Sequence, residues 1–185
     1  MIRGKNLILR TFRESDLNTY FDIVSDLSHM TEFWPAHLQS ETNLRKEFSE
    51  NGFWKAEYKL MLITDIEGKL IGEVDTFKTS PNIQGVEAGY RIFQKRDMGK
   101  GYATEALRLF SAYLYTTNPT MLRLTLLIRS DNIGSMKVAE KCGYQNEGTL
   151  RNAWVDDGRP YSMEIYSLLR DECPKLQDLL EKSQL

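Results

Sequence analysis

The sequence is poor in the residues that build disulfides and metal sites, with two cysteines and two histidines in 185 residues. Cys142 and Cys173 are far apart and form no Cys-x-x-Cys motif, which indicates reduced thiols of an intracellular protein. His29 and His37 are too few for a histidine-rich metal site. We therefore expect neither a disulfide framework nor a bound metal.

The chain also lacks an excess of charge of one sign and any apolar run long enough to cross a bilayer. Its 24 lysines and arginines and 26 aspartates and glutamates give a formal net charge of −2, which favours no nucleic-acid partner. The first residues, Met1 to Lys5, lack the apolar core of a signal peptide. These features predict a cytoplasmic protein with neither a nucleic-acid nor a membrane partner.

What is present is the composition of an ordinary globular protein, 41% hydrophobic, of a length that fits one domain over residues 1–185. Helical periodicity, with Ser15, Ser40 and Asn132 as N-caps, predicts helices at 16–24, 40–51, 101–116, 133–142 and 175–182. Turn-bounded runs predict strands at 7–10, 59–64, 69–77, 86–93, 121–128, 144–155 and 161–168. We predict an α+β domain with a mixed, mostly antiparallel central sheet flanked by helices, and a loop at 26–35.

The stretch from Gln94 to Ala106 combines a strand end, two glycines and the start of a helix. Glycines there let a ligand approach the backbone, and the free N–H groups of a first helical turn attract phosphate. The Rossmann pattern fails because Thr104 stands where a third small residue is needed, and no Gly-Lys-Ser/Thr P-loop is present. The stretch predicts a pyrophosphate site; alternatively, the glycines serve only the geometry of the turn.

Arg96-x-x-Gly99-x-Gly101, followed by Tyr-Ala-Thr-Glu-Ala, resembles the acyl-CoA loop of the GNAT N-acetyltransferase family. A second block resembles the RimJ/RimL branch, which acetylates ribosomal-protein N-termini and related amines; it comprises Asn132-x-x-Ser135, Glu140 to Tyr144, Glu147-Gly148 and Arg151. The resemblance covers nearly the whole chain. It implies a GNAT-like domain that uses acetyl-CoA as acetyl donor and an amine as acceptor.

The resemblance also implies which residues hold the donor. Backbone groups of Ile92, Phe93 and Gln94 would pair with the pantetheine arm. Asn132 would contact the coenzyme through its side chain, act only as an N-cap, or do both. The pyrophosphate would lie on the loop and first helical turn, formed by Arg96, Met98, Gly99, Lys100, Gly101, Tyr102 and Ala103.

The implied reaction is direct attack of a neutral amine on the thioester. An α-amine with a pKa of about 8 is roughly one-tenth neutral at pH 7, so a modest general base suffices. Glu87 is the leading candidate, because the family often places a carboxylate on this strand; the alternative is a solvated strand carboxylate. Glu73 and Asp75 are weaker candidates.

Two positions depart from the family pattern. Ala139 stands where many relatives have a tyrosine that protonates the departing thiolate, and Ser135 is the substitute that the resemblance suggests. Alternatively, Ser135 is an ordinary polar residue of the first helical turn, and water protonates the thiolate. Ser162 replaces a common aspartate of the last hairpin, so the acceptor cannot be copied from the branch. An N-terminal α-amine, a small amine such as an aminoglycoside or polyamine, and a coenzyme A sensor without turnover all stay open, as do a monomer and a homodimer. Trp34, Phe53, Trp54 and Trp154 would line an acceptor pocket or belong to the core.

Overall fold

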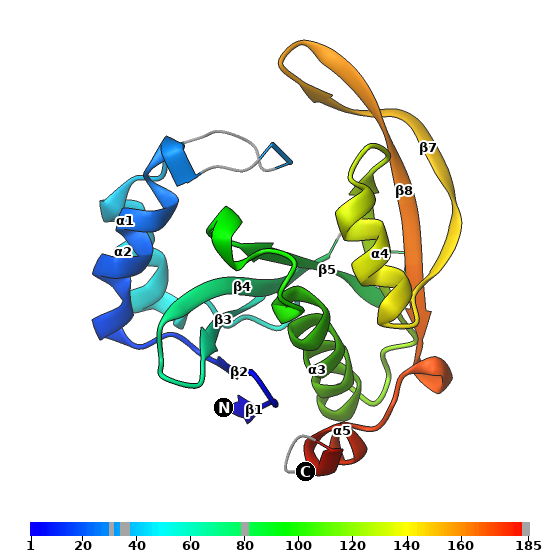
Figure 1. The fold of residues 1–185 in the computed structure, drawn as a ribbon, viewed down its shortest axis with the longest axis horizontal. Helices are drawn as coiled ribbons and strands as arrows, with labels where there is room; N and C mark the ends of the chain where they lie inside the picture. The colour runs from blue at the N-terminus through cyan, green and yellow to red at the C-terminus, as the bar shows by residue number, and fades with distance from the viewer. Residues whose placement is uncertain (30–31, 34–37, 79–81, 183–185) are drawn as a thin grey trace.

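The computed structural model describes residues 1–29, 32–33, 38–78 and 82–182, with the backbone alone at His29 and Lys182. Within these residues, eight strands form one sheet in the order β1-β2-β3-β4-β5-β6-β8-β7 (Figure 1). The strands are β1 (Ile2–Arg3), β2 (Leu7–Arg10), β3 (Lys59–Asp65), β4 (Leu70–Phe77), β5 (Gly85–Ile92), β6 (Arg123–Arg129), β7 (Gln145–Asp156) and β8 (Arg159–Leu169). The helices are α1 (Leu17–Val24), α2 (Glu41–Asn51), α3 (Tyr102–Thr117), α4 (Ile133–Lys141) and α5 (Leu176–Lys182). Among these eight described strands, β5 and β6 form the single parallel pair, which confirms the mixed, mostly antiparallel α+β fold.

Most predicted elements are confirmed to within two residues, but the N-cap at Ser15 is wrong. Ser15 lies inside a 3-10 turn, Glu14–Asp16, and α1 begins just after it. Asp16 organises this turn, because its carboxylate accepts a hydrogen bond from the Arg13 N–H at 2.7 Å and pairs with Arg10 at 2.6 Å. A longer charged side chain with two partners therefore outweighs the local capping preference of serine.

The stretch predicted as a loop at 26–35 contains a further short 3-10 turn, Leu27–His29, and its residues 30–31 and 34–35 lie outside the described residues. The cap predicted at Ser40 is confirmed, since its hydroxyl accepts a hydrogen bond from the Asn43 N–H at 3.4 Å. The sequence did not predict β1, which is only two residues long.

The sheet separates two hydrophobic cores. Helices α3 and α4 cover one face, and α1 and α2 lie at the opposite side of the sheet (Figure 1). Successive side chains of a strand point to opposite faces. Accordingly Ile92 belongs to the core under α3, whereas Phe93 belongs to the core under α1 and α2. The same alternation places Tyr90 on the α3 face of β5 and Glu87 on the face of α1 and α2.

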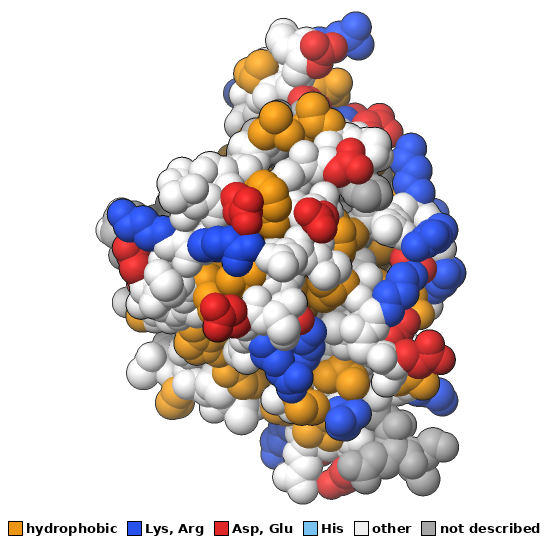
Figure 2. Space-filling view, turned by 90° about the vertical axis from the view of Figure 1, so that its left-hand side faces the viewer, with side chains coloured by type: hydrophobic (Ala, Val, Ile, Leu, Met, Phe, Trp, Pro, Cys, Tyr) orange, Lys and Arg blue, Asp and Glu red, His pale blue; other side chains and the backbone are white. Residues whose placement is uncertain are grey.

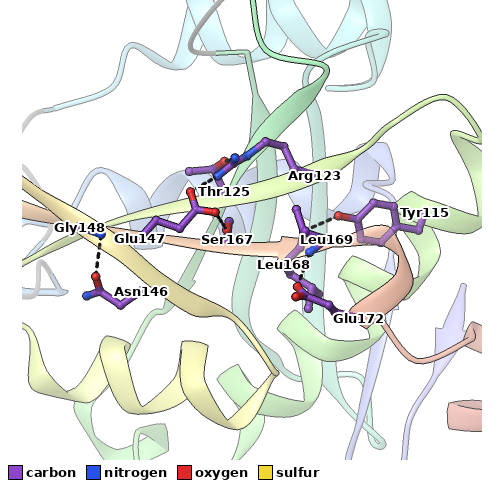
Figure 3. Close-up of polar contacts among 10 residues, drawn as sticks. All are labelled: Tyr115, Arg123, Thr125, Asn146, Glu147, Gly148, Ser167, Leu168, Leu169 and Glu172. Atoms are coloured by element: carbon purple, nitrogen blue, oxygen red, sulfur yellow. Dashed lines mark hydrogen bonds and ion pairs between the residues drawn. The ribbon is translucent and has the colours of Figure 1, made fainter.

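Polar side chains hold the long β7–β8 hairpin to β6 (Figure 3). Glu147 on β7 pairs with Arg123 on β6 and accepts a hydrogen bond from the Ser167 hydroxyl on β8 at 2.5 Å. Beside it, the register of β7 shifts between Asn146 and Gly148, and the Gly148 N–H donates to the Asn146 side chain at 2.8 Å. Glu147-Gly148 therefore fixes a β-bulge in the outermost strand.

Figure 2 shows the face that α1 and α2 cover, where basic, acidic and apolar side chains are interspersed. Charges of both signs therefore share this face, in keeping with the small net charge of the whole chain. Among the helices of the described residues, none has the length and apolar character needed to span a membrane.

Candidate active site

Strands β5 and β6 diverge after three paired residues. Their parallel ladder joins residues 85–87 to residues 123–125 and then stops. In the described ladders, β5 continues to Ile92 on the β4 side, while β6 continues to Arg129 on the β8 side. The strand edges that face each other beyond residue 87 can therefore accept a peptide-like chain in extended conformation. We call this region, residues 88–92 of β5 and 126–129 of β6, the β5–β6 divergence.

The backbone of the predicted pantetheine site is only partly available. The Phe93 N–H already donates to the Ile71 carbonyl of β4 at 2.9 Å, so that group cannot bind a ligand. Backbone groups of successive strand residues point to opposite edges, so those of Ile92 and Gln94 point toward the β6 side. By the same alternation the Phe93 carbonyl points toward β4, and the Gln94 carbonyl already accepts a hydrogen bond from the Asp97 N–H at 2.9 Å. The predicted site is thus narrowed to the N–H and carbonyl groups of Ile92 and to the Gln94 N–H.

The loop before α3 forms an open cradle at the end of β5. Gly99 and Gly101 have φ angles of 74° and 89°, and a Cβ at either position would meet nothing within 4 Å. Beneath the loop, the buried Asp97 carboxylate pairs with Lys100 at 3.0 Å and Lys69 at 3.3 Å. The loop is therefore held from below while its glycines face open space at the start of a 16-residue helix.

Asp97 balances part of the positive charge that Lys95, Arg96 and Lys100 give to this loop. Lys100 is bound to Asp97, and Arg96 lies 4.0 Å from the same carboxylate. Lys95 and Arg96 remain exposed. Backbone N–H groups of the first turn of α3 therefore contribute more of the anion-binding character than the sequence alone suggests.

Asn132 precedes α4 at the other wall of the divergence. Its side-chain oxygen accepts a hydrogen bond from the Ser135 N–H at 3.0 Å, which confirms the predicted N-cap. The amide NH2 group of Asn132 is not used by that bond, and its contact with the coenzyme stays a prediction.

Glu87 lies where the β5–β6 ladder ends. It is paired with Thr125, it is 7% exposed, and its Oε2 has no hydrogen-bond partner among the described residues. Burial and the negative charge of Asp75 raise the pKa of Glu87 to about 7, against a backbone hydrogen bond from Leu127 that lowers it. Glu87 is thus a buried carboxyl that can change protonation near neutral pH.

Glu73 on β4 is less suited to act as a base. Its carboxylate pairs with Arg91 at 3.0 Å and accepts a hydrogen bond from the Tyr20 hydroxyl at 2.7 Å. Both oxygens are therefore engaged in a buried network that joins α1, β4 and β5. Glu73 is therefore a weaker candidate for the general base than Glu87, in agreement with the sequence analysis.

Tyr90 is a site residue that the sequence analysis did not single out. Its hydroxyl lies 2.9 Å from the Ser135 hydroxyl oxygen and 3.1 Å from the Ser135 carbonyl, and so connects β5 with the first turn of α4. Burial raises the pKa of Tyr90 above its usual range, so the group stays a neutral hydrogen-bond donor. Ala139, at the position of the usual tyrosine, is fully buried. Tyr90 and Ser135 together place hydroxyl groups beside the divergence.

We expect the S135A variant to lower kcat about tenfold, because it removes a hydroxyl that can donate to the departing thiolate, worth about 1.4 kcal/mol in the transition state. The Y90F variant should lower kcat less, since Ser135 keeps its own hydroxyl. The rate of thiol release at saturating concentrations of both substrates gives kcat for each variant. Ser111, whose hydroxyl lies 2.8 Å from that of Tyr144 in the core, provides a matched control. The S111A variant should lose stability without a specific loss of kcat, and an S135A rate equal to wild type would contradict the assignment.

Arg129 is a second residue that the sequence analysis missed. It is 8% exposed at the end of β6, and its guanidinium pairs with Asp131 and with Asp156, each at 2.7 Å. It also lies over the rings of Phe33 at 4.7 Å and Tyr161 at 4.1 Å. Arg129 therefore joins three separate segments on the Glu87 face of the sheet. An arginine at the end of an apolar strand, two residues before an aspartate, is the sequence signal that could have indicated it.

The aromatic residues suggested for an acceptor pocket have different surroundings. Phe53 is 1% exposed and belongs to the core under α1 and α2. Trp54 packs against the ring of Tyr113, with centroids 6.3 Å apart. Trp154 is 42% exposed on β7, and Trp34 lies outside the described residues. Of these residues, Trp154 has an exposed side chain on the hairpin.

An open strand edge, a glycine cradle at a helix N-terminus and a buried carboxyl with an unpartnered oxygen occur together around the β5–β6 divergence. The first two fit the amide-bearing arm and the pyrophosphate of coenzyme A, and the third fits removal of a proton from an acceptor. The fold and site thus define a coenzyme A-dependent acyltransferase.

Comparison with known proteins identifies the family. The family described as "Acetyltransferase (GNAT) domain" matches residues 6–145, and the chain belongs to it. It is 24% identical to an SPbeta prophage-derived uncharacterized N-acetyltransferase of Bacillus subtilis, over 91% of this chain and 93% of that protein. It is 29% identical to the ribosomal-protein-serine acetyltransferase of Escherichia coli, over 75% and 76% of the two chains. The chain is an acetyl-CoA-dependent N-acetyltransferase.

A solved structure has the same fold. The spermidine N-acetyltransferase from Vibrio cholerae, in complex with CoA and spermine, superposes with a TM-score of 0.75. The match covers 90% of this chain and 96% of that one, at 19% sequence identity.

Proposed function

We propose that the acceptor is an N-terminal α-amine of a protein, as in the RimJ/RimL branch, and that residues 1–185 act as one catalytic domain. The observation that carries this proposal is the buried Glu87 carboxyl at the end of the β5–β6 ladder, where burial and the charge of Asp75 raise its pKa to about 7. A carboxylate of this basicity removes a proton readily from an α-ammonium with a pKa of about 8, but poorly from a lysine-type ammonium near 10.4. The similarity to a ribosomal-protein-serine acetyltransferase supports the same class of acceptor.

In this proposal each residue of the site has one task. Acetyl-CoA, when bound, supplies the acetyl group as a thioester. Glu87 takes the proton of the acceptor ammonium, so that the nitrogen lone pair can attack the thioester carbon as the C–S bond breaks. Ser135, oriented by Tyr90, donates a hydrogen bond to the sulfur that leaves with the electron pair. The nitrogen loses a second proton as it becomes an amide, and this proton passes through water to the sulfur, which leaves as a thiol. The cradle at Gly99 and Gly101 holds the pyrophosphate.

A second candidate is a polyamine acceptor. Asp75 and Glu87 lie on one face of β4 and β5, beside a Glu73 whose charge Arg91 balances, and acidic groups at a site attract a polycation. This candidate differs from the first in the number of charges on the acceptor.

A panel of acceptors separates the candidates. Thiol release with acetyl-CoA is measured against peptides with free N-terminal serine or alanine, the same peptides with blocked N-termini, spermidine and an aminoglycoside. We expect the free peptides to have the highest kcat/KM and the blocked peptides to be inert. A preference for spermidine would replace the first candidate by the second. Acetyl-CoA binding by calorimetry without thiol release from any amine would contradict both and favour a sensor.

The raised pKa of Glu87 predicts the pH dependence of the reaction. Glu87 must be ionised to accept a proton, so kcat/KM should fall about tenfold per pH unit below an acidic limb near pH 7. Peptide acceptors with different α-amine pKa values distinguish this limb from titration of the substrate. The limb should stay in place as the acceptor changes, and a limb that follows the acceptor pKa would contradict the assignment to Glu87.

A further inference from the structure

Asp75 and Glu87 lie on the same face of two adjacent strands. In the antiparallel ladder of β4 and β5, Asp75 is opposite Gly89, and Glu87 is two residues before Gly89. Residues i and i+2 of a strand share a face, and such diagonal neighbours are about 7–8 Å apart. The register therefore places Asp75 and Glu87 on one face as diagonal neighbours where the β5–β6 ladder ends, near enough for the charge of Asp75 to act on Glu87.

Gly89 makes room for the Asp75 carboxyl group. A Cβ at residue 89 would lie 2.2 Å from Asp75 Oδ1 and 3.2 Å from Asp75 Cγ. The Asp75 carboxyl thus lies directly over the backbone of Gly89, in space that any other residue would fill. This contact directs Asp75 along β5, between the positions of Glu87 and Arg91.

The other charged groups of this region are already arranged around Glu73. Arg91 of β5 forms an ion pair with Glu73 of β4, and Tyr20 of α1 donates to the same carboxylate. The positive charge of Arg91 also lowers the pKa of Asp75, although burial and the charge of Glu73 raise it more. The hydroxyl of Tyr58, just before β3, also lies in the field of Asp75, and β6 contributes the backbone at Leu127.

We propose that Asp75 is a positioning residue that forms a carboxyl pair with Glu87 over Gly89, and that this pair holds one proton and presents one negative charge to the acceptor ammonium. The inference rests on the proposed role of Glu87 as the base. In the step, an N–H bond of the ammonium breaks and an O–H bond forms on the ionised Glu87, while Asp75 keeps the proton of the pair. The nitrogen lone pair then attacks the thioester as described above.

The protonation equilibria are consistent with such a pair. Burial and then the charge of Glu73 raise the pKa of Asp75 to about 7, while burial and then the charge of Asp75 raise that of Glu87 to about 7. Two carboxyl groups that repel each other ionise in two steps that belong to the pair. One proton between them at neutral pH leaves an acceptor for the ammonium proton and avoids two adjacent buried charges.

The pH profile of kcat/KM in the D75N variant tests the pair. Removing the negative charge of Asp75 makes Glu87 easier to ionise, so the acidic limb should move to lower pH, by roughly one unit. The G89A variant should move it in the same direction, because the new methyl displaces the flexible Asp75 carboxyl. The double variant D75N/G89A should move it no further than D75N alone. As a control, E67Q removes an exposed carboxylate from the β3–β4 turn and should leave the limb in place.

The outcomes distinguish this inference from the proposed function. If D75N is inactive at every pH while acetyl-CoA still binds, Asp75 is itself the base and the positioning role is overturned. If D75N and G89A both keep the wild-type limb, the pair is overturned although Glu87 can still be the base. If E87Q keeps the full rate, the proposed function fails first. Circular dichroism checks the fold of each variant. If D75N does not fold, the position of the acidic limb in G89A alone tests the carboxyl pair.

Discussion

Replacement of Glu87 by glutamine is expected to lower kcat/KM by about 10²-fold or more, the usual contribution of a positioned general base. Glutamine keeps the size of the side chain and can still occupy the buried position between β5 and β6, but it cannot take up the amine proton. Affinity for acetyl-CoA should stay unchanged, since the glycine cradle lies at the opposite end of β5. Steady-state thiol release and calorimetry with acetyl-CoA measure the two quantities separately.

The control for E87Q is E147Q, which removes a carboxylate from the same sheet. Glu147 pairs with Arg123 and Ser167 at the base of the hairpin, so its loss should lower stability and leave the chemical step intact (Figure 3). The residual rate of E87Q should also lose the acidic limb near pH 7. A residual rate that keeps this limb would show that another group is the base.

Substitution of Gly101 by alanine is expected to weaken acetyl-CoA binding about tenfold, or 1.4 kcal/mol. Gly101 has a φ of 89°, a backbone conformation that costs an L-residue about 1–2 kcal/mol. The alanine methyl would also fill the open space that a pyrophosphate needs, and relaxation of φ would turn the first N–H groups of α3 away from it. Calorimetric titration with acetyl-CoA gives the affinity directly.

The chain contains a matched control for this substitution. Gly68, in the turn between β3 and β4, has a φ of 94°, and a Cβ there would likewise meet nothing within 4 Å. The variants G68A and G101A should therefore lose a similar free energy of unfolding, measured in urea. Only G101A should lose affinity for acetyl-CoA. An equal loss of acetyl-CoA affinity in both variants would show that the glycines of the loop serve backbone geometry alone.

The sequence predicted the features that a few neighbouring residues determine. The caps at Ser40 and Asn132 follow from short-range hydrogen bonds, and the loop with Gly99 and Gly101 from its place at a helix start. One local prediction was wrong: Ser15 is not the N-cap of α1, because Asp16 forms an ion pair with Arg10 and organises the turn before the helix. Local patterns therefore fixed most elements, and long charged side chains modified them.

Features that depend on strand register could not be predicted. Asp75 meets Gly89 only because β4 and β5 pair in one register, and a shift of one residue would turn Asp75 to the other face. Tyr90 reaches Ser135, 45 residues later, across the β5–β6 divergence. Arg129 contacts Phe33 from a distant part of the chain. These contacts require the three-dimensional arrangement of the sheet, which composition and periodicity do not contain.

The divergence of β5 and β6 leaves unpaired backbone groups inside the sheet rather than at its outer edge. Unpaired backbone groups at the outer edge of a sheet invite a strand of another molecule and lead to aggregation. Here the unpaired stretch lies inside the sheet, with β4 on one side, β6 and β8 on the other, and α3 and α4 over one face (Figure 1). A slender extended chain can enter such a space lengthwise, whereas a strand still attached to a folded neighbour cannot. The fold thus offers open hydrogen-bonding groups to a slender extended ligand without lengthening the outer edges of the sheet.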